Sequence, residues 1–99
     1  MTPEIAARLS ALDIRLMAEA RAYTIFARGN CLAVAQRNEA GFSSLGSSGM
    51  MTEAGLAYLV WREGRPLLVA KQSEVEAAPT QLEELRQFSG DLRSALGLD

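Results

Sequence analysis

Four small residues near the middle of the chain, Gly46-Ser47-Ser48-Gly49, form the segment best suited to hold a ligand. Small residues let backbone amides converge on an anion, and the two hydroxyls add hydrogen-bond donors. A phosphate loop of the P-loop type would continue with a Lys-Ser/Thr pair opening a helix, but Met50-Met51 stands there instead. Two interpretations remain: a site for an anionic small molecule, with Arg28, Arg37 or Arg62 nearby, and a tight turn or bulge between strands.

The residue inventory excludes most catalytic chemistry. The chain has no histidine, which removes Ser-His-Asp and Cys-His arrangements and the commonest zinc ligand. Its single cysteine, Cys31, forms no intrachain disulfide and leaves too few thiolates for a zinc or iron–sulfur centre. Cys31 is either a thiol activated by Arg28 or a small, semi-buried strand residue. We predict no catalytic residue, no metal, no cofactor and no enzymatic activity.

Charge and hydropathy limit the classes of partner. A net charge of −2 argues against nucleic acid, whose binding rests on neutralising phosphates. No apolar run approaches the length of a membrane span, and the N-terminus does not resemble a secretory signal. The single cysteine suits a reducing compartment. We expect a bacterial, cytoplasmic protein that contacts neither nucleic acid nor membrane.

Two amphipathic helices are predicted at the ends of one 99-residue α+β domain, over residues 1–20 and 79–97. The first begins at Thr2-Pro3-Glu4, a typical N-terminal signal, and its apolar residues recur every three or four positions. The second begins with a capping box at Thr80-Gln81-Leu82-Glu83 and ends at Gly97. Its apolar stripe consists of Leu82, Leu85, Phe88, Leu92 and Leu96.

Two apolar hairpins lie between the helices, over residues 22–37 and 56–72. Gly29-Asn30 predicts a type II′ turn in the first, which pairs Ala27 with Leu32 and Ile25 with Val34. For the second, Pro66 lacks an amide hydrogen, which favours a three-residue loop closed by Arg65.

A Gly/Ser-rich connector, residues 38–55, joins the hairpins. A loop of this length is improbable in a small domain, so residues 42–45 are predicted to add a short strand. Ser73–Glu76 is a candidate for a short separate turn. The fold predicted is therefore a single antiparallel sheet of four to five strands flanked by two helices. This order of elements resembles small roadblock- and profilin-like modules, which use such sheets for dimerisation and partner docking.

The second hairpin is apolar on both faces, because Leu56, Tyr58 and Val60 alternate with Ala57, Leu59 and Trp61. Strands of this kind occur where both faces of a sheet are covered, and two helices of this size are expected to cover one face well and the other only partly. We therefore predict a non-catalytic protein-interaction or regulatory module that forms a homodimer and binds a further protein. The interface residues proposed are Tyr58, Val60, Trp61 and Leu68, and the alternative function is anion sensing at Gly46–Gly49.

Overall fold

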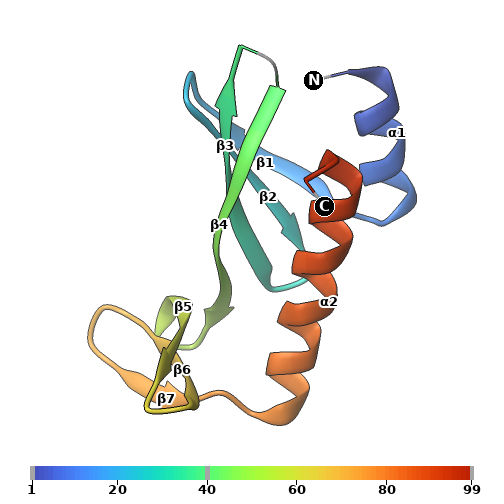
Figure 1. Cartoon of the computed structure of the whole chain (residues 1–99). Helices are drawn as coiled ribbons and strands as arrows, with labels where there is room; N and C mark the ends of the chain where they lie inside the picture. The colour runs from blue at the N-terminus through green and yellow to red at the C-terminus, as the bar shows by residue number, and fades with distance from the viewer. Residues whose placement is uncertain (1, 40, 99) are drawn as a thin grey trace.

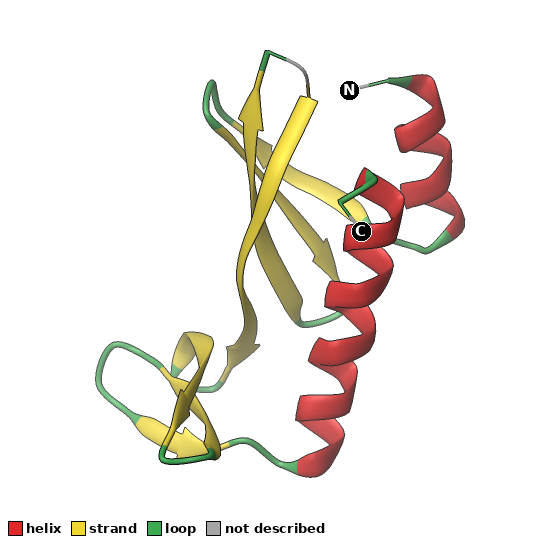
Figure 2. Cartoon of the chain, viewed as in Figure 1, coloured by secondary structure: helices red, strands yellow, loops and turns green. Residues whose placement is uncertain are grey.

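The computed structural model describes residues 2–39 and 41–98, with only the backbone of Ser47. Two helices, α1 (Pro3–Ala11) and α2 (Pro79–Leu96), flank an antiparallel sheet (Figures 1 and 2), which confirms the α+β class. The sheet has seven strands rather than four to five. They are β1 (Arg15–Glu19), β2 (Tyr23–Arg28), β3 (Cys31–Asn38), β4 (Gly41–Thr52), β5 (Gly55–Arg62), β6 (Arg65–Val69) and β7 (Glu74–Glu76).

The strands follow one another across the sheet in sequence order, and each neighbouring pair is antiparallel. The long central strand β4 pairs with β3 over residues 41–50 and with β5 over residues 49–52. The hairpin strands β1–β3 and β5–β7 therefore lie toward opposite ends of β4 (Figure 1). Helix α2 runs alongside β4 and packs on β3 and β4, while α1 packs on α2.

The prediction of a first helix over residues 1–20 is wrong, because α1 ends at Ala11. Asp13 takes a left-handed conformation with a φ of 58°. The amide of Ile14 then donates to the carbonyl of Leu9 at 2.9 Å, the long-range bond of a Schellman cap. Asp adopts this conformation more readily than most residues, so the cap forms without the glycine that usually marks it.

The chain after this cap forms β1, whose five residues are all exposed. β1 pairs with β2 as an edge strand, with an irregularity at Met17 between Leu16 and Ala18. Leu16 continues the helical spacing of the apolar residues before it, which is why the sequence pattern favours a helix. Hydrogen bonding to β2 outweighs that local preference.

The connector over residues 38–55 is mostly strand, because β4 occupies twelve of its residues. The strand predicted over residues 42–45 therefore covers only part of β4. Gly and Ser have low strand propensity. The strand forms nevertheless because β4 pairs with β3 on one side and β5 on the other, and both neighbours supply backbone hydrogen bonds.

The first hairpin forms as predicted. Ala27 pairs with Leu32 and Ile25 with Val34. Gly29 has a φ of 59°, as the first central position of a type II′ turn requires.

The predicted three-residue loop of the second hairpin is wrong. Glu63 and Gly64 form a two-residue turn with φ values of 54° and 77°, the type I′ pattern, so Arg62 pairs directly with Arg65. Such turns match the twist of paired strands, and here Glu63 accepts a conformation that glycine or asparagine normally supplies.

Residues 74–76 form β7 and not the short turn predicted for Ser73–Glu76. β7 pairs with β6, so β6 is an interior strand and β7 becomes the edge of the sheet. Pro66 is the second residue of this interior strand, opposite Trp61 on β5. Its carbonyl accepts a hydrogen bond from the amide of Ala77 at 2.9 Å.

The predicted C-terminal helix is confirmed, and its stripe meets the sheet. Its buried residues are Leu85, Phe88, Leu92, Ala95 and Leu96. They pack against one side of the sheet, which we call the inner face and whose buried residues include Phe26, Cys31, Ala33, Ala35, Met50, Ala57 and Leu68.

The ends of α2 differ in how well the sequence signals them. Gly97 closes the helix in the left-handed conformation, as predicted, with a φ of 74°. The capping box predicted at Thr80 lies two residues too late. The helix begins at Pro79, and the side chain of Gln81 accepts the amide hydrogen of Ala78 at 2.9 Å.

Two glycines test this account of the packing. A Cβ at Gly49 would lie 2.9 Å from the carbonyl oxygen of Ala57, whereas a Cβ at Gly90 of α2 would meet nothing within 4 Å. We expect Gly49→Ala to destabilise the protein by about 1–3 kcal/mol through overpacking. Gly90→Ala should instead stabilise it by about 0.5–1 kcal/mol through helix propensity. Urea denaturation measures both, and an unchanged midpoint for Gly49→Ala would contradict the close approach of β4 and β5.

Candidate functional site

The segment Gly46-Ser47-Ser48-Gly49 lies inside β4 and is not a turn. Ala33 pairs with Ser48 and Ala35 with Leu45, so Gly46 and Ser47 together oppose one residue of β3 and form a bulge. A Cβ at Gly46 would lie 3.3 Å from the carbonyl oxygen of Val34. Of the two interpretations, the structure supports the bulge.

The small residues of β4 serve its packing against α2. The hydroxyl of Ser48 hydrogen-bonds with the hydroxyl of Ser89 on the helix. The side chain of Ser47 lies outside the described part of the structure. Gly49 is buried between β3 and β5, where it pairs with Leu32 and Tyr58. The backbone here is committed to strand pairing and does not form a loop whose amides converge on an anion.

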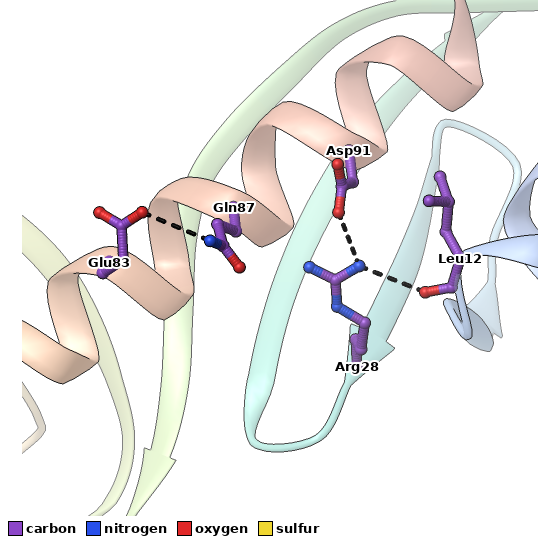
Figure 3. Close-up of polar contacts among 5 residues, drawn as sticks. All are labelled: Leu12, Arg28, Glu83, Gln87 and Asp91. Atoms are coloured by element: carbon purple, nitrogen blue, oxygen red, sulfur yellow. Dashed lines mark hydrogen bonds and ion pairs between the residues drawn. The ribbon is translucent and has the colours of Figure 1, made fainter.

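Arg28 joins three elements at the end of β2. Its Nη1 donates to the Asp91 carboxylate of α2 at 2.9 Å and to the carbonyl of Leu12 at the end of α1 at 3.2 Å (Figure 3). Its guanidinium carbon also lies 5.6 Å from the centroid of the Phe88 ring. The side chain is only 26% exposed, so its charge is used within the fold.

The other two arginines considered for the anion site also pair with carboxylates. Arg37 forms an ion pair with Glu19, and Arg62 forms one with Glu74. Arg62 lies four residues beyond the last β4–β5 pair, at the tip of the β5–β6 hairpin. The structure therefore does not gather free arginine side chains around Gly46–Gly49.

Cys31 is 1% exposed on the inner face. Burial, and secondly the charge of Glu84, raise the pKa of its thiol from the ordinary value of 9.0 to about 11, against a smaller lowering by Arg28. A thiol of this kind is a poor nucleophile at neutral pH. The structure thus favours the semi-buried strand residue over the activated cysteine.

In the part of the chain that the structure describes, both helices lie on one side of the sheet, and the opposite side carries neither of them (Figure 2). Strand register defines it, because directly paired residues share a face: Leu32 pairs with Gly49, Gly49 with Tyr58, and Tyr58 with Val69. We call this side the outer face; its large apolar residues are Tyr23, Ile25, Leu32, Val34, Met51, Leu56, Tyr58, Val60, Leu67 and Val69. None of these ten side chains belongs to the core or packs against it.

The four predicted interface residues divide between the two faces. Tyr58 and Val60 lie on the outer face and are 44% and 37% exposed. Trp61 points to the inner side and is 59% exposed, beyond the cover of α2. Leu68 is 5% exposed within the core, which removes it from a surface that a partner could cover.

Sequence reasoning missed the contribution of the first hairpin to the outer face. Tyr23 is 44% exposed there, and Ile25 and Val34 are half-buried. The predicted register already groups these residues on one side of the hairpin. The register does not reveal which side of the hairpin α2 covers. The contact with α2 decides which side becomes core and which remains surface.

No known protein-family model matches the sequence, and neither curated proteins nor solved structures give a significant match. Over residues 2–39 and 41–98, no group of three or more His, Cys, Asp or Glu side chains is placed to hold a metal ion. Within the same ranges, neither helix is long and apolar enough to cross a membrane.

The Arg28 contacts predict a marked difference between two arginine variants. Arg28→Met removes a partly buried, charge-assisted network and should destabilise the protein by about 1–3 kcal/mol. Arg62→Met removes a pair whose side chains are 57% and 40% exposed, and should cost no more than about 1 kcal/mol. Equal shifts in the urea midpoints of the two variants would contradict the structural role of Arg28.

The buried thiol predicts a specific dependence of stability on pH. Because the pKa of Cys31 is higher in the folded state, at about 11, the unfolded chain loses the thiol proton first as pH rises above 9.0. The free energy of unfolding should fall between these values by an amount on the order of 2 kcal/mol. Cys31→Ala supplies the comparison, since it removes this thiol alone. Parallel pH profiles for the two proteins would refute the effect.

Proposed function

We propose that this chain is a non-catalytic protein-interaction module of the bacterial cytoplasm that works as a homodimer through its outer face. The supporting observation is the one-sided core: both helices serve the inner face, while ten large apolar side chains on the other remain partly exposed. Contiguous apolar patches on a sheet are typical of protein–protein contact sites. The free, buried thiol of Cys31 is compatible with a reducing compartment.

A second copy of the chain is the occupant that best suits this face. In a twofold dimer the same patch meets itself, so it must carry no unbalanced charge. On strands β5–β7, the charges beside the apolar residues are balanced within one chain, because Arg62 pairs with Glu74 and Arg65 with Glu76. This part of an identical face can therefore approach without repulsion between like charges.

Pairing between sheet edges is a less suitable mode of association. The irregularity at Met17 distorts the edge strand β1, and the other edge, β7, has only three residues. Bulges and short strands at sheet edges hinder strand-to-strand pairing. Face-to-face packing does not depend on either edge.

Two neighbouring substitutions on β5 test the proposal. The wild-type chain should form a dimer in light-scattering and sedimentation measurements between about 1 and 100 µM. Val60→Glu places a charge on the outer face and should weaken dimerisation at least about tenfold, a change of about 1.4 kcal/mol. Trp61→Glu changes an exposed residue of the same strand that faces inward, and should leave the dimer intact.

Two results would overturn the proposal. One is a strictly monomeric wild-type chain throughout this concentration range. The other is a dimer disrupted by Trp61→Glu but not by Val60→Glu, which would move the interface to the inner side. Circular dichroism spectra matching wild type would show that both variants remain folded.

A further inference from the structure

A groove of about 890 Å³ opens between the inner face of the sheet and the first half of α2. It lies where the helix no longer covers the sheet, since α2 packs on β3 and β4 and the strands β5–β7 extend beyond them (Figure 1). This volume is within the range of about 300–1,000 Å³ typical of small-molecule sites.

The floor of the groove is apolar. It is formed by Met50, Ala57, Leu68 and Val75, which follow one another across β4, β5, β6 and β7. The first three are buried core residues, whereas Val75 is 62% exposed at the open side. The floor is thus closed by the packed core, and Val75 supplies its exposed apolar surface.

The rim of the groove carries negative charge only. Glu53 in the β4–β5 turn and Glu84 on α2 line it, together with the polar residues Asn30 and Ser73, and no lysine or arginine does. Neither glutamate takes part in an ion pair among the described residues, unlike Glu83, which pairs with Arg86. Two carboxylates without a cation, beside an apolar floor, give the groove a negative potential that favours a cationic occupant.

We infer that the groove is a binding site for a small organic cation, an ammonium or guanidinium group carried on an apolar body. The apolar body packs against Val75 at the open side of the floor, and the cation lies beside the carboxylates of Glu53 and Glu84. An anionic ligand is disfavoured here by the same two charges. The site is on the inner side of the sheet, so it does not depend on the proposed dimer.

Three probes that share a seven-carbon chain separate the contributions of charge and apolar contact. Heptylamine is cationic at neutral pH, heptan-1-ol is neutral and octanoate is anionic. Titrations of the wild-type chain followed by ¹H–¹⁵N NMR should show heptylamine shifting the amide signals of Asn30, Ala54 and Ser73. We expect it to bind about 5–10-fold more tightly than the alcohol, with octanoate the weakest.

Variants of the two carboxylates test the source of that preference. The double variant Glu53→Gln/Glu84→Gln should bind heptylamine and heptan-1-ol equally. Glu83→Gln is the matched control, because it removes a charge one residue away on α2 that does not line the groove, and its preference should remain that of wild type. Val75→Ser, at an exposed floor position, should weaken all three probes.

Three outcomes would overturn the inference. These are binding of octanoate as tight as that of heptylamine, an ammonium preference retained in the double variant, and the absence of any shift at groove amides with heptylamine. Unchanged amide spectra elsewhere in each variant would show that the fold is intact.

Discussion

Helix α2 packs its apolar stripe onto the small side chains of β3 and β4, and the other features of the protein follow from where that contact begins and ends. The side chains beneath the helix are small, namely Ala33 and Ala35 on β3 and Ser48 on β4, so α2 can approach the sheet closely. Phe88 and Leu92 of the helix are fully buried in this contact. A helix of 18 residues is about 27 Å long, and it covers the centre of the sheet but not its far strands.

This limited cover creates two unpartnered surfaces for different physical reasons. The outer face is uncovered because α1 packs on α2 and not on the free side of the sheet. The groove arises because β5–β7 continue past the end of the helix contact, leaving Val75 and Trp61 exposed on the inner side. Beyond the core residues Ala57 and Leu68, the second hairpin thus lacks helical cover on both sides.

The charged residues reinforce this division of the molecule. Arg28 and Asp91 hold β2, α1 and α2 together where the helices meet the sheet. The Arg62–Glu74 pair instead lies at the exposed tip of the second hairpin and balances charge beside the outer face. Glu53 and Glu84 remain without an ion pair among the described residues, and both line the groove. Sequence composition alone does not separate these three uses of charge.

The amino-acid sequence by itself determined the elements whose signals are local. The stripe and terminal glycine of α2, and the Gly29-Asn30 turn with its register, depend on residues a few positions apart. Tertiary structure decided the rest: β1 and β4 became strands because neighbouring strands supply hydrogen bonds that their own propensities do not predict. The placement of α2 likewise decided which residues of each two-sided strand are core and which are surface. Which face becomes core depends on contacts between residues far apart in the chain, such as that of Ser48 with Ser89. A local sequence pattern does not predict such contacts.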